Sequence, residues 1–504
     1  MTTTRRRRWL VAAATAAALA LGGCATGTGS STAETTLRWA IALPAHWDPV
    51  VSGSGAQFRI LSLAYASLVE IDENGKAVPS LAASWDYNAT GDQVTFRLRP
   101  NLKFSDGEPL DAQAVKLYLE RAKTQKNSAL FGDLTSIKEI TAKGDLDVVI
   151  NLTQVDYQIP LLLGERVAQI TSPKAAQDPA KLDQSPVGAG PFVVTEIVPG
   201  SHVYLKKNPD YWDAANIKID RVEVHAAPDS ATIVSSLQTG VYDFASLDAT
   251  QIKAAKAAKL DVVFQPGYNA SNISINVNKK PFDNPKVVDA VRYAVNRQEF
   301  VDKVTFGYGK ATDQAFPPGY IAYDEESANK YPYDVAKAKA LLAEAGYAPG
   351  DIKIDFVIPA QSTAAEIIQS QLAAIGITTT IKVNPNWSTP FFAKDLTLSV
   401  YGTTGRESPV QTLTAHFGPN GPLNLSTPYQ PEGFEAAVAL ARQTPLDSPD
   451  YAKNLKAATR VGLQSRALVF TYSFPNVFVK SPRVSAITPI PGQIHWAGLT
   501  VASS

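Results

Sequence analysis

The stretch that decides the fold class is residues 352–383, IKIDFVIPAQSTAAEIIQSQLAAIGITTTIKV. Apolar and polar side chains largely alternate over residues 352–358, as they do in a strand with one buried face. The apolar residues that follow recur three or four positions apart, the spacing of an amphipathic helix: Ile367, Ile368, Leu372 and Ile375. Gly376 ends this helix, and residues 377–383 form the next strand. Because a strand, a helix and a strand in succession form a parallel unit, the sequence predicts an α/β fold.

Two more helices are predicted upstream of this unit. Residues 283–285 (DNP) read as a cap followed by a first-turn proline, and the helix that they begin carries an apolar stripe of Val288, Val291, Val295 and Phe300. Asp334 caps a second helix that ends at Gly346 and turns inward Ala338, Leu341, Leu342 and Ala345. Such stripes are typical of a packed core rather than of cofactor contacts.

The N-terminal half also mixes strand and helix patterns. Residues 36–41 and 146–152 are predicted strands, and Val94, Phe96 and Leu98 alternate with polar residues in another. Asp111 caps a helix with one apolar face, formed by Val115, Tyr118 and Ala122.

The N-terminus has the features of an export signal. Four arginines at residues 5–8 precede an apolar run over residues 9–21, which is too short to span a membrane but suits a signal-peptide core. LGGC at residues 21–24 resembles the lipobox of bacterial lipoproteins, which implies cleavage before Cys24 and a lipid on its sulfur. The alternative is a buried structural cysteine behind an uncleaved anchor. Residues 24–35, rich in Gly, Ser and Thr, are expected to form a flexible tether.

Composition excludes several classes of protein. The 504 residues are 45% hydrophobic and 19% charged, which is typical of folded protein and allows about three domains. Cys24 is the only cysteine, so neither an internal disulfide nor a cysteine-based zinc site can form. Cleavage of the signal removes four arginines and leaves 43 basic against 47 acidic side chains, a net charge of −4. A slightly acidic chain has no electrostatic basis for binding nucleic acid.

The sequence contains no arrangement of residues typical of an enzyme. It has no GxSxG motif, P-loop, HExxH motif or dinucleotide-binding glycine motif. The histidines are scattered without metal-ligand spacing, and each fits a polar or surface position: His46, His202, His225, His416 and His495. We therefore expect no catalytic residue, metal or cofactor. Two distant carboxylates can still meet in a folded chain, so a secreted hydrolase stays an alternative.

Eight short blocks follow one another along the chain. They are PSLAASW (79–85), TFRLR (95–99), KFSDG (103–107), PVGAGPF (186–192), KNPDYW (207–212), NVNKKPF (276–282), VRYAVNR (291–297) and KALLAEAGY (339–347). In this order they resemble extracellular solute-binding proteins of the oligopeptide/dipeptide/nickel type, and the resemblance runs from about residue 36 to about residue 480. These proteins are the receptors of ABC importers. The resemblance implies a receptor that binds a solute and delivers it to a membrane permease with ATPase subunits.

The resemblance also implies a bilobal fold of periplasmic-binding-protein type II. Lobe I would comprise residues 36–64, 184–270 and 476–504, an inserted subdomain residues 65–183, and lobe II residues 271–475. The ligand would lie between the lobes, and hinge closure would bury it. Gly188 and Gly190 fit a tight turn or a close backbone approach near the hinge, and Trp85 and Trp212 fit packing anchors better than ligand platforms.

Residues 402–409 bear on which kind of ligand the chain binds. In peptide-binding relatives, a segment reading Trp-x-x-Asp-Tyr-x-x-Pro supplies an aspartate that pairs with the peptide's α-ammonium. The matching residues 402–409 (GTTGRESP) place Gly402 at the Trp position and Gly405 at the Asp position. Glu407 offers a replacement carboxylate. Arg406 offers a planar donor fork for a carboxylate or phosphate. The alternative is a surface arginine that pairs with Glu407 or is solvated.

The same alignment supplies the other candidate ligand contacts. They are Ser52, Gly53 and Ser54 after the first strand, Thr403 and Thr404 in the segment above, Trp387, and Tyr472. An aromatic side chain with hydroxyls and small residues suits a sugar or sugar conjugate as well as a peptide.

Three functions are therefore considered. The first is an importer receptor for a peptide or peptide-like solute. The second is the same receptor for a non-peptide ligand such as an opine, an oligosaccharide or a metal chelate, and the third is a secreted hydrolase or adhesin. As a receptor, the chain is expected to be an exported monomer, anchored through Cys24 to the outer face of the cytoplasmic membrane or in the periplasm. Anchoring would raise its effective concentration near the permease.

Overall fold

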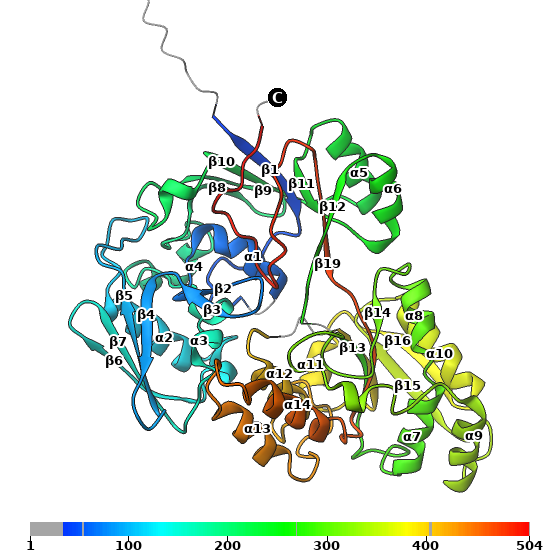
Figure 1. The fold of residues 1–504 in the computed structure, drawn as a ribbon. Coiled ribbons are helices and arrows are strands. Elements are labelled where there is room, and N and C mark those ends of the chain that lie inside the picture. The colour runs from blue at the N-terminus through cyan, green and yellow to red at the C-terminus, as the bar shows by residue number, and fades with distance from the viewer. Residues whose placement is uncertain (1–33, 53–54, 269, 403–405, 503–504) are drawn as a thin grey trace, which may run out of the picture. The chain divides into compact units, whose positions relative to one another are not determined.

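The computed structural model describes residues 34–52, 55–268, 270–402 and 406–502. Within these residues the largest sheet has seven strands: β1 (Thr36–Ile41), β8 (Phe192–Val198), β9 (His202–Lys207), β10 (Arg221–Ala226), β11 (Phe244–Ser246), β12 (Asp261–Gln265) and β19 (Asn476–Lys480). Their order is β12-β19-β11-β1-β10-β9-β8 (Figure 1). β1 runs parallel to its neighbours β10 and β11, and the remaining pairs are antiparallel. The strand predicted over residues 36–41 is confirmed.

The core beneath this sheet joins both ends of the described chain. Trp39 of β1 lies with its ring centroid 5.5 Å from that of Phe244 and 5.6 Å from that of Trp496. Trp496 belongs to a C-terminal segment whose Val484 and Val501 are buried in the same core. Three helices also belong to this part of the chain: α1 (Gly55–Ala64), α5 (Ser230–Gln238) and α6 (Ile252–Ala257).

A second sheet has six strands: β13 (Ser271–Ile275), β14 (Lys310–Ala311), β15 (Lys353–Ile358), β16 (Thr378–Val383), β17 (Leu398–Gly402) and β18 (Leu468–Ser473). Their order is β14-β18-β13-β17-β15-β16. β15 pairs in parallel with β16 over all six residues of each strand, and α10 (Thr363–Ala374) connects them. The parallel unit predicted from residues 352–383 is confirmed.

Helices pack around this second sheet: α7 (Pro285–Ala294), α8 (Arg297–Lys303), α9 (Val335–Glu344), α11 (Ser388–Phe392), α12 (Pro409–Phe417), α13 (Phe434–Arg442) and α14 (Tyr451–Gly462). The predicted caps of α7 and α9 are confirmed, because the Asn284 and Asp334 side chains accept hydrogen bonds from the first turn of each helix.

The prediction of one helix running through Phe300 is wrong. The backbone is extended at Val295 and Asn296, with ψ of 106° and 94°, so α7 ends before them. The Asn296 side chain then accepts a hydrogen bond from the Glu299 amide and begins α8. An asparagine that bonds its own downstream backbone competes with helix continuation, and this local competition outweighed the apolar stripe. The stripe persists because Phe300 of α8 is buried in the same core as α7.

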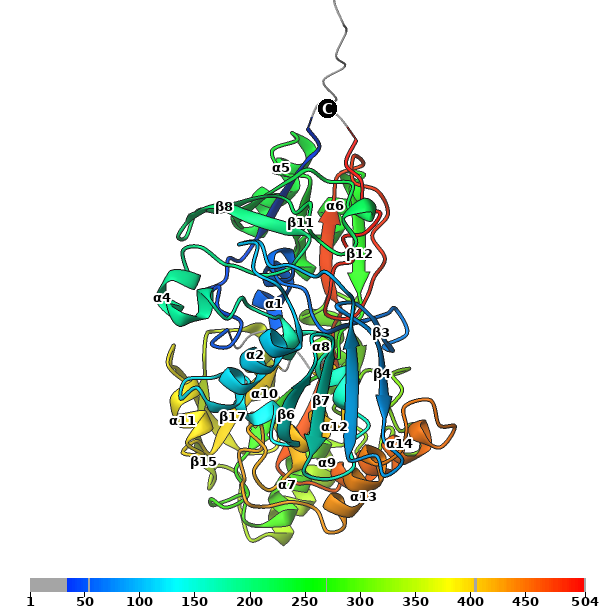
Figure 2. The ribbon, with the colours of Figure 1, turned by 90° about the vertical axis from the view of Figure 1, so that its left-hand side faces the viewer.

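A third, antiparallel sheet has the strand order β4 (Ala82–Tyr87), β5 (Gln93–Leu98), β7 (Asp147–Leu152) and β6 (Ile137–Lys143). Helix α2 (Ala112–Thr124) lies against β6 and β7 (Figure 2). The Asp111 side chain accepts a hydrogen bond from the Ala114 amide at 2.8 Å, and α2 buries Val115, Tyr118 and Ala122 as predicted. The hairpin β2 (Val69–Ile71) and β3 (Ala77–Pro79) and two short helices, α3 (Ile159–Leu162) and α4 (Pro179–Leu182), complete this region.

Six described segments form single 3₁₀ turns: Phe131–Asp133, Arg166–Ala168, Ala175–Gln177, Ala214–Asn216, Ala249–Gln251 and Glu325–Ser327. No helix among the described residues is both long and apolar enough to cross a membrane.

The chain passes between the seven-stranded and six-stranded sheets twice, from β12 to β13 and from β18 to β19. The lobe boundaries expected after residues 270 and 475 fall in these two connections. The full set of lobe and subdomain boundaries stays a prediction.

Gly188 and Gly190 allow the close backbone approach that the sequence predicts. A Cβ atom on Gly188 would lie 2.3 Å from the carbonyl oxygen of Ala64, and one on Gly190 would lie 2.4 Å from the carbonyl carbon of the same residue. Any side chain at either position would therefore push against the end of α1.

Candidate ligand-binding cavity

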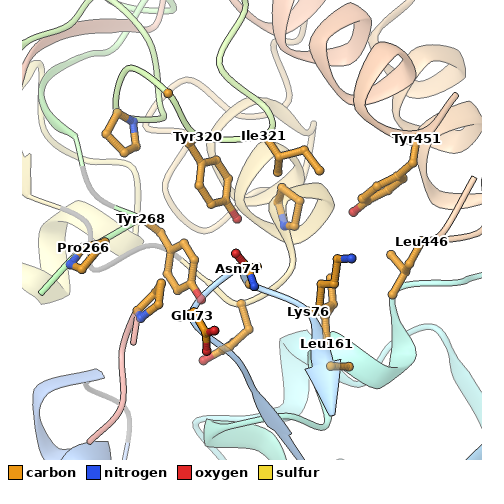
Figure 3. Close-up of a pocket in the computed structure, with 18 of the residues that line it drawn as sticks. Glu73, Asn74, Lys76, Leu161, Pro266, Tyr268, Tyr320, Ile321, Leu446 and Tyr451 are labelled. Carbon is orange, nitrogen blue, oxygen red and sulfur yellow. The ribbon is translucent and has the colours of Figure 1, made fainter. Parts of the chain in front are cut away.

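A cavity of about 1150 Å³ is lined by three parts of the chain. The first is the β2–β3 hairpin with β4 and α3; its Glu73, Asn74 and Lys76 appear in Figure 3. The second is the pair of connections between the two large sheets, which supplies Tyr268. The third lies around β14, α12 and α14 and supplies Tyr451. Ligand pockets commonly measure about 300–1,000 Å³, so this cavity has room for a short peptide.

Aromatic side chains form a large part of the cavity wall. They are Trp85, Tyr87, Tyr157, Tyr268, Tyr308, Tyr320, Tyr451 and Phe474. Trp85 also packs against Phe96, with ring centroids 6.0 Å apart, so it serves both the core and the cavity. Trp212 packs against the same core outside the cavity lining, with the Arg99 guanidinium 4.0 Å from its ring centroid. Such a wall suits apolar and aromatic ligand groups, and aromatic faces also attract cations.

The charged residues of the described wall are more acidic than basic. The acids are Glu73, Asp86, Glu407 and Asp447, and the bases are Lys76 and Lys310. Five of the six are exposed, whereas Glu407 is only 8% exposed. The wall therefore favours a ligand with a cationic group, and Glu407 is its one buried charge among the described residues.

Two buried polar atoms of the cavity wall lack partners. Glu407 Oε2 and the Tyr268 hydroxyl have no hydrogen-bond partner among the described residues. The hydroxyl of Tyr451 is satisfied by comparison, because it donates to Gln158 Oε1 at 2.8 Å. A buried polar group without a partner destabilises the protein by about 1–3 kcal/mol, so these atoms mark a place where a polar ligand group would be favourable.

Glu407 has a second carboxyl group beside it. Burial raises the pKa of Glu165 well above its ordinary value, and the neighbouring Glu407 raises it further. Arg59 and Gln493 lower this pKa, but by less. Glu165 is 3% exposed and lies behind Glu407, outside the cavity lining. Burial is also the main cause that raises the pKa of the Tyr268 and Tyr320 hydroxyls, with both glutamates contributing.

An ion-pair network flanks this end of the cavity. Asp133 binds both Arg166 and Arg406, and its side chain is 8% exposed. The alternative in which Arg406 pairs with Glu407 at the surface is wrong, because the arginine pairs with Asp133 and Glu407 is buried. Since Asp133 follows α2 and Arg406 follows β17, this network ties the third sheet's region to the six-stranded sheet's region.

The sequence-predicted ligand residues lie in different places. Glu407 lines the cavity. Ser52 donates to Gln57 Oε1 at 2.7 Å, Tyr472 stacks on Phe300 at 5.8 Å, and Trp387 packs against Phe391 at 5.0 Å. None of these three is among the described residues that line the cavity. Gly53, Ser54, Thr403, Thr404, Gly405 and the lipidation candidate Cys24 lie outside the described residues.

Sequence reasoning missed most of the cavity wall. Neither Glu165, which lies behind the wall, nor the wall residues Tyr268 and Tyr320 belong to the quoted family blocks, and no local pattern marks them. The one sequence feature that could have indicated the two tyrosines is the prolines near them. Pro266, Pro317 and Pro318 indicate connecting segments rather than strands or helices. Among the described residues, no group of three or more His, Cys, Asp or Glu side chains is placed to hold a metal ion.

Comparison with known proteins identifies the family. Residues 76–424 match the family model described as bacterial extracellular solute-binding proteins, family 5. This chain belongs to that family. Family 5 proteins are the solute-binding receptors of ABC importers, so the chain is a receptor of this kind, and the resemblance seen in the sequence blocks is confirmed.

Two curated relatives show what this family 5 receptor is similar to. It is 32% identical to di/tripeptide-binding protein 3 of Pseudomonas aeruginosa over 374 residues, which cover 66% of this chain and 69% of the relative. It is 33% identical to the glutathione-binding protein GsiB of Pectobacterium atrosepticum over 382 residues, which cover 74% and 73% of the two chains. Both relatives are named as binding proteins, one for di- and tripeptides and one for glutathione.

Solved structures confirm the bilobal α/β fold of the receptor. AgaA of A. tumefaciens R10, in complex with agropinic acid, superposes with a TM-score of 0.80 at 25% identity, covering 93% of this chain and 99% of AgaA. DppA of Helicobacter pylori, in complex with the peptide STSA, superposes with a TM-score of 0.82 at 23% identity, covering 93% and 98%. The family description also indicates that the chain is an exported protein.

Proposed function

We propose that this receptor binds short peptides, or peptide-like solutes, through a free amino group that pairs with Glu407. The observation that carries the proposal is the buried, unpartnered Oε2 of Glu407 in the wall of the aromatic cavity. A ligand ammonium at this oxygen would form a charge-assisted hydrogen bond in a site screened from solvent. The two relatives named above, which bind di- and tripeptides and glutathione, support the choice of a peptide.

The remaining cavity wall suits the rest of a peptide. Exposed Lys76 and Lys310 line the same cavity and offer cations for a ligand carboxylate. The aromatic residues offer contacts for apolar side chains without specifying one. We infer a binding site that fixes the ligand's amino end and tolerates variety elsewhere.

The proposed cycle is binding without chemical conversion. The parts assigned to lobe I and lobe II would close on the ligand by bending at the two connections between the large sheets, and the closed form would then dock on a permease. In this proposal the chain is a monomer that stays at the outer face of the membrane through a lipid on Cys24. Incubation with peptides should leave them intact, and lipid labelling should be lost in Cys24→Ser.

A non-peptide ligand is the second candidate. The observation in its favour is the aromatic wall, because flat aromatic faces also stack on sugar rings, together with the likeness to AgaA, which was solved with agropinic acid.

A thermal denaturation screen separates these ligands. Di- to pentapeptides with free amino groups should raise the Tm of the purified chain by several degrees at saturating concentration, because a ligand that binds only the folded state stabilises it. The same peptides with acetylated amino groups should raise it far less. Stabilisation by opines or oligosaccharides alone would favour the second candidate, and equal stabilisation by free and acetylated peptides would contradict the role of Glu407.

A further inference from the structure

Two carboxyl groups meet in the interior behind the cavity. Glu165 precedes the 3₁₀ turn Arg166–Ala168, and Glu407 precedes α12, so the two acids come from distant parts of the sequence. Their exposures are 3% and 8%. Glu165 Oε1 and Glu407 Oε2 each lack a hydrogen-bond partner among the described residues. The two carboxyl groups lie within hydrogen-bonding reach of each other. Two buried carboxylates so placed oppose each other's ionisation.

The surrounding charges offset only part of this repulsion. Arg59, itself buried, acts on Glu165 from α1, and Gln493 of the C-terminal segment hydrogen-bonds it. The positive charge of Arg166 attracts both glutamates, but this arginine already forms an ion pair with Asp133. Asp133 also forms an ion pair with Arg406. The remaining titratable neighbours, Tyr268 and Tyr320, are neutral hydroxyls at neutral pH.

The backbone of the C-terminal segment packs closely against Glu165. A Cβ atom on Gly492 would lie 2.7 Å from Glu165 Oε2, so the C-terminal segment crowds this carboxyl group. Glu407, which also neighbours Glu165, lines the cavity. A solvent molecule or ligand therefore reaches the pair from the cavity, through Glu407.

We propose that Glu165 and Glu407 share one proton in the ligand-free receptor, and that binding of a ligand's ammonium group at Glu407 releases this proton to solvent. The proposal rests on the proposed function, because it takes the ammonium as the arriving charge. One positive charge enters as the ligand's NH₃⁺ and one leaves as the proton, so the site's charge is conserved. Burial, with the neighbouring Glu407, raises the pKa of Glu165 well above its ordinary value, which supports retention of the proton at neutral pH.

Proton release makes ligand affinity depend on pH. Because the bound state holds fewer protons than the free state, raising the pH favours binding, by up to about tenfold in Kd per pH unit while the pair holds its proton. The receptor would then bind amino-bearing ligands more weakly in an acidic medium. Glu165 acts here as a positioning residue, since it reaches the ligand only through Glu407.

Isothermal titration calorimetry with the dipeptide Ala-Phe tests the proposal. Titrations at pH 7 in two buffers of different ionisation enthalpy should show about one proton released per bound peptide. Glu165→Gln should abolish the release and flatten the pH dependence of Kd. Glu432→Gln, an exposed acid outside the cavity lining, is the matched control and should release the proton as the wild type does.

Each outcome decides the question. Binding of Ala-Phe without proton exchange, or unchanged release in E165Q, would overturn the shared proton and leave the proposed function standing. Absence of binding by Ala-Phe and by every other free-amino peptide would overturn the proposed function, and the proposal that rests on it. Should E165Q not fold, infrared difference spectra of the wild type replace it: a buried protonated carboxyl band must disappear when Ala-Phe is added, and its persistence overturns the proposal.

Discussion

Replacing Gly190 by alanine should destabilise this chain strongly, because the added methyl group meets backbone rather than side chain. A Cβ atom there would lie 2.4 Å from the Ala64 carbonyl carbon and 2.5 Å from the Tyr65 amide nitrogen. No rotamer change relieves these contacts, so the end of α1 must move by about 1 Å to restore ordinary van der Waals distance.

That movement disturbs two hydrogen bonds. The Gly190 amide donates to the Ala64 carbonyl at 2.9 Å, and the buried Tyr65 hydroxyl donates to the Trp47 carbonyl at 2.8 Å. Overpacking alone destabilises by about 1–3 kcal/mol, and a weakened buried hydrogen bond adds about 1 kcal/mol. We expect Gly190→Ala to lower the free energy of unfolding by about 3 kcal/mol, a large part of the 5–15 kcal/mol of an ordinary domain.

Urea denaturation followed by circular dichroism measures this effect. Gly132→Ala is the matched control, because a Cβ atom on Gly132 meets nothing within 4 Å and its φ is outside the left-handed region. The control should change the free energy of unfolding by less than about 1 kcal/mol. Equal midpoints for the two variants would refute the close approach of residue 190 to α1.

Three further predictions concern charge and recognition. Burial lowers the pKa of His416 to about 4, so below pH 6.5 the unfolded chain binds a proton at this residue that the folded chain does not bind. The free energy of unfolding should therefore fall by up to about 3 kcal/mol between pH 6.5 and 4. In His416→Gln, the free energy of unfolding measured by urea denaturation should depend less on pH. Asp133→Asn leaves Arg166 and Arg406 without their shared carboxylate and should destabilise by about 3 kcal/mol, whereas a loss below 1 kcal/mol would show that the network is dispensable. Tyr268→Phe removes an unpartnered hydroxyl, so it should leave the Tm within a degree of the wild type or raise it slightly. The same variant should bind peptide about fivefold more weakly in calorimetry. An unchanged Kd would exclude the hydroxyl from the binding site.

The fold was largely predictable because its signals are local. The alternation and helical spacing within residues 352–383 reflect one buried face in each element, and the caps at Asp111 and Asp334 bond only their own first turns. The wrong prediction of a single helix through Asn296 also follows from relying on a local pattern. A stripe of apolar residues looks the same in the sequence whether it belongs to one helix or to two successive helices that bury the same face.

The cavity was predictable at one residue only. Glu407 could be found because it lies within residues 402–409, the segment that the family resemblance singled out. Glu165 could not, because its significance arises from contact with Glu407, which depends on how distant segments pack. Trp387 and Tyr472 carry the residue types of a ligand site, yet in this structure their rings pack against Phe391 and Phe300 outside the described cavity lining.

The most direct test of peptide recognition by Glu407 is the ratio of Kd values for Ala-Phe and its N-acetylated form, measured by calorimetry on the wild type and on Glu407→Gln. A charge-assisted hydrogen bond stabilises by about 1.5–3 kcal/mol, so acetylation should weaken binding to the wild type by at least about tenfold. In the variant, the free and acetylated peptides should bind within about threefold of each other. A wild-type ratio near one, or an equally large ratio in the variant, would contradict the assignment of Glu407 as the ligand's ammonium partner.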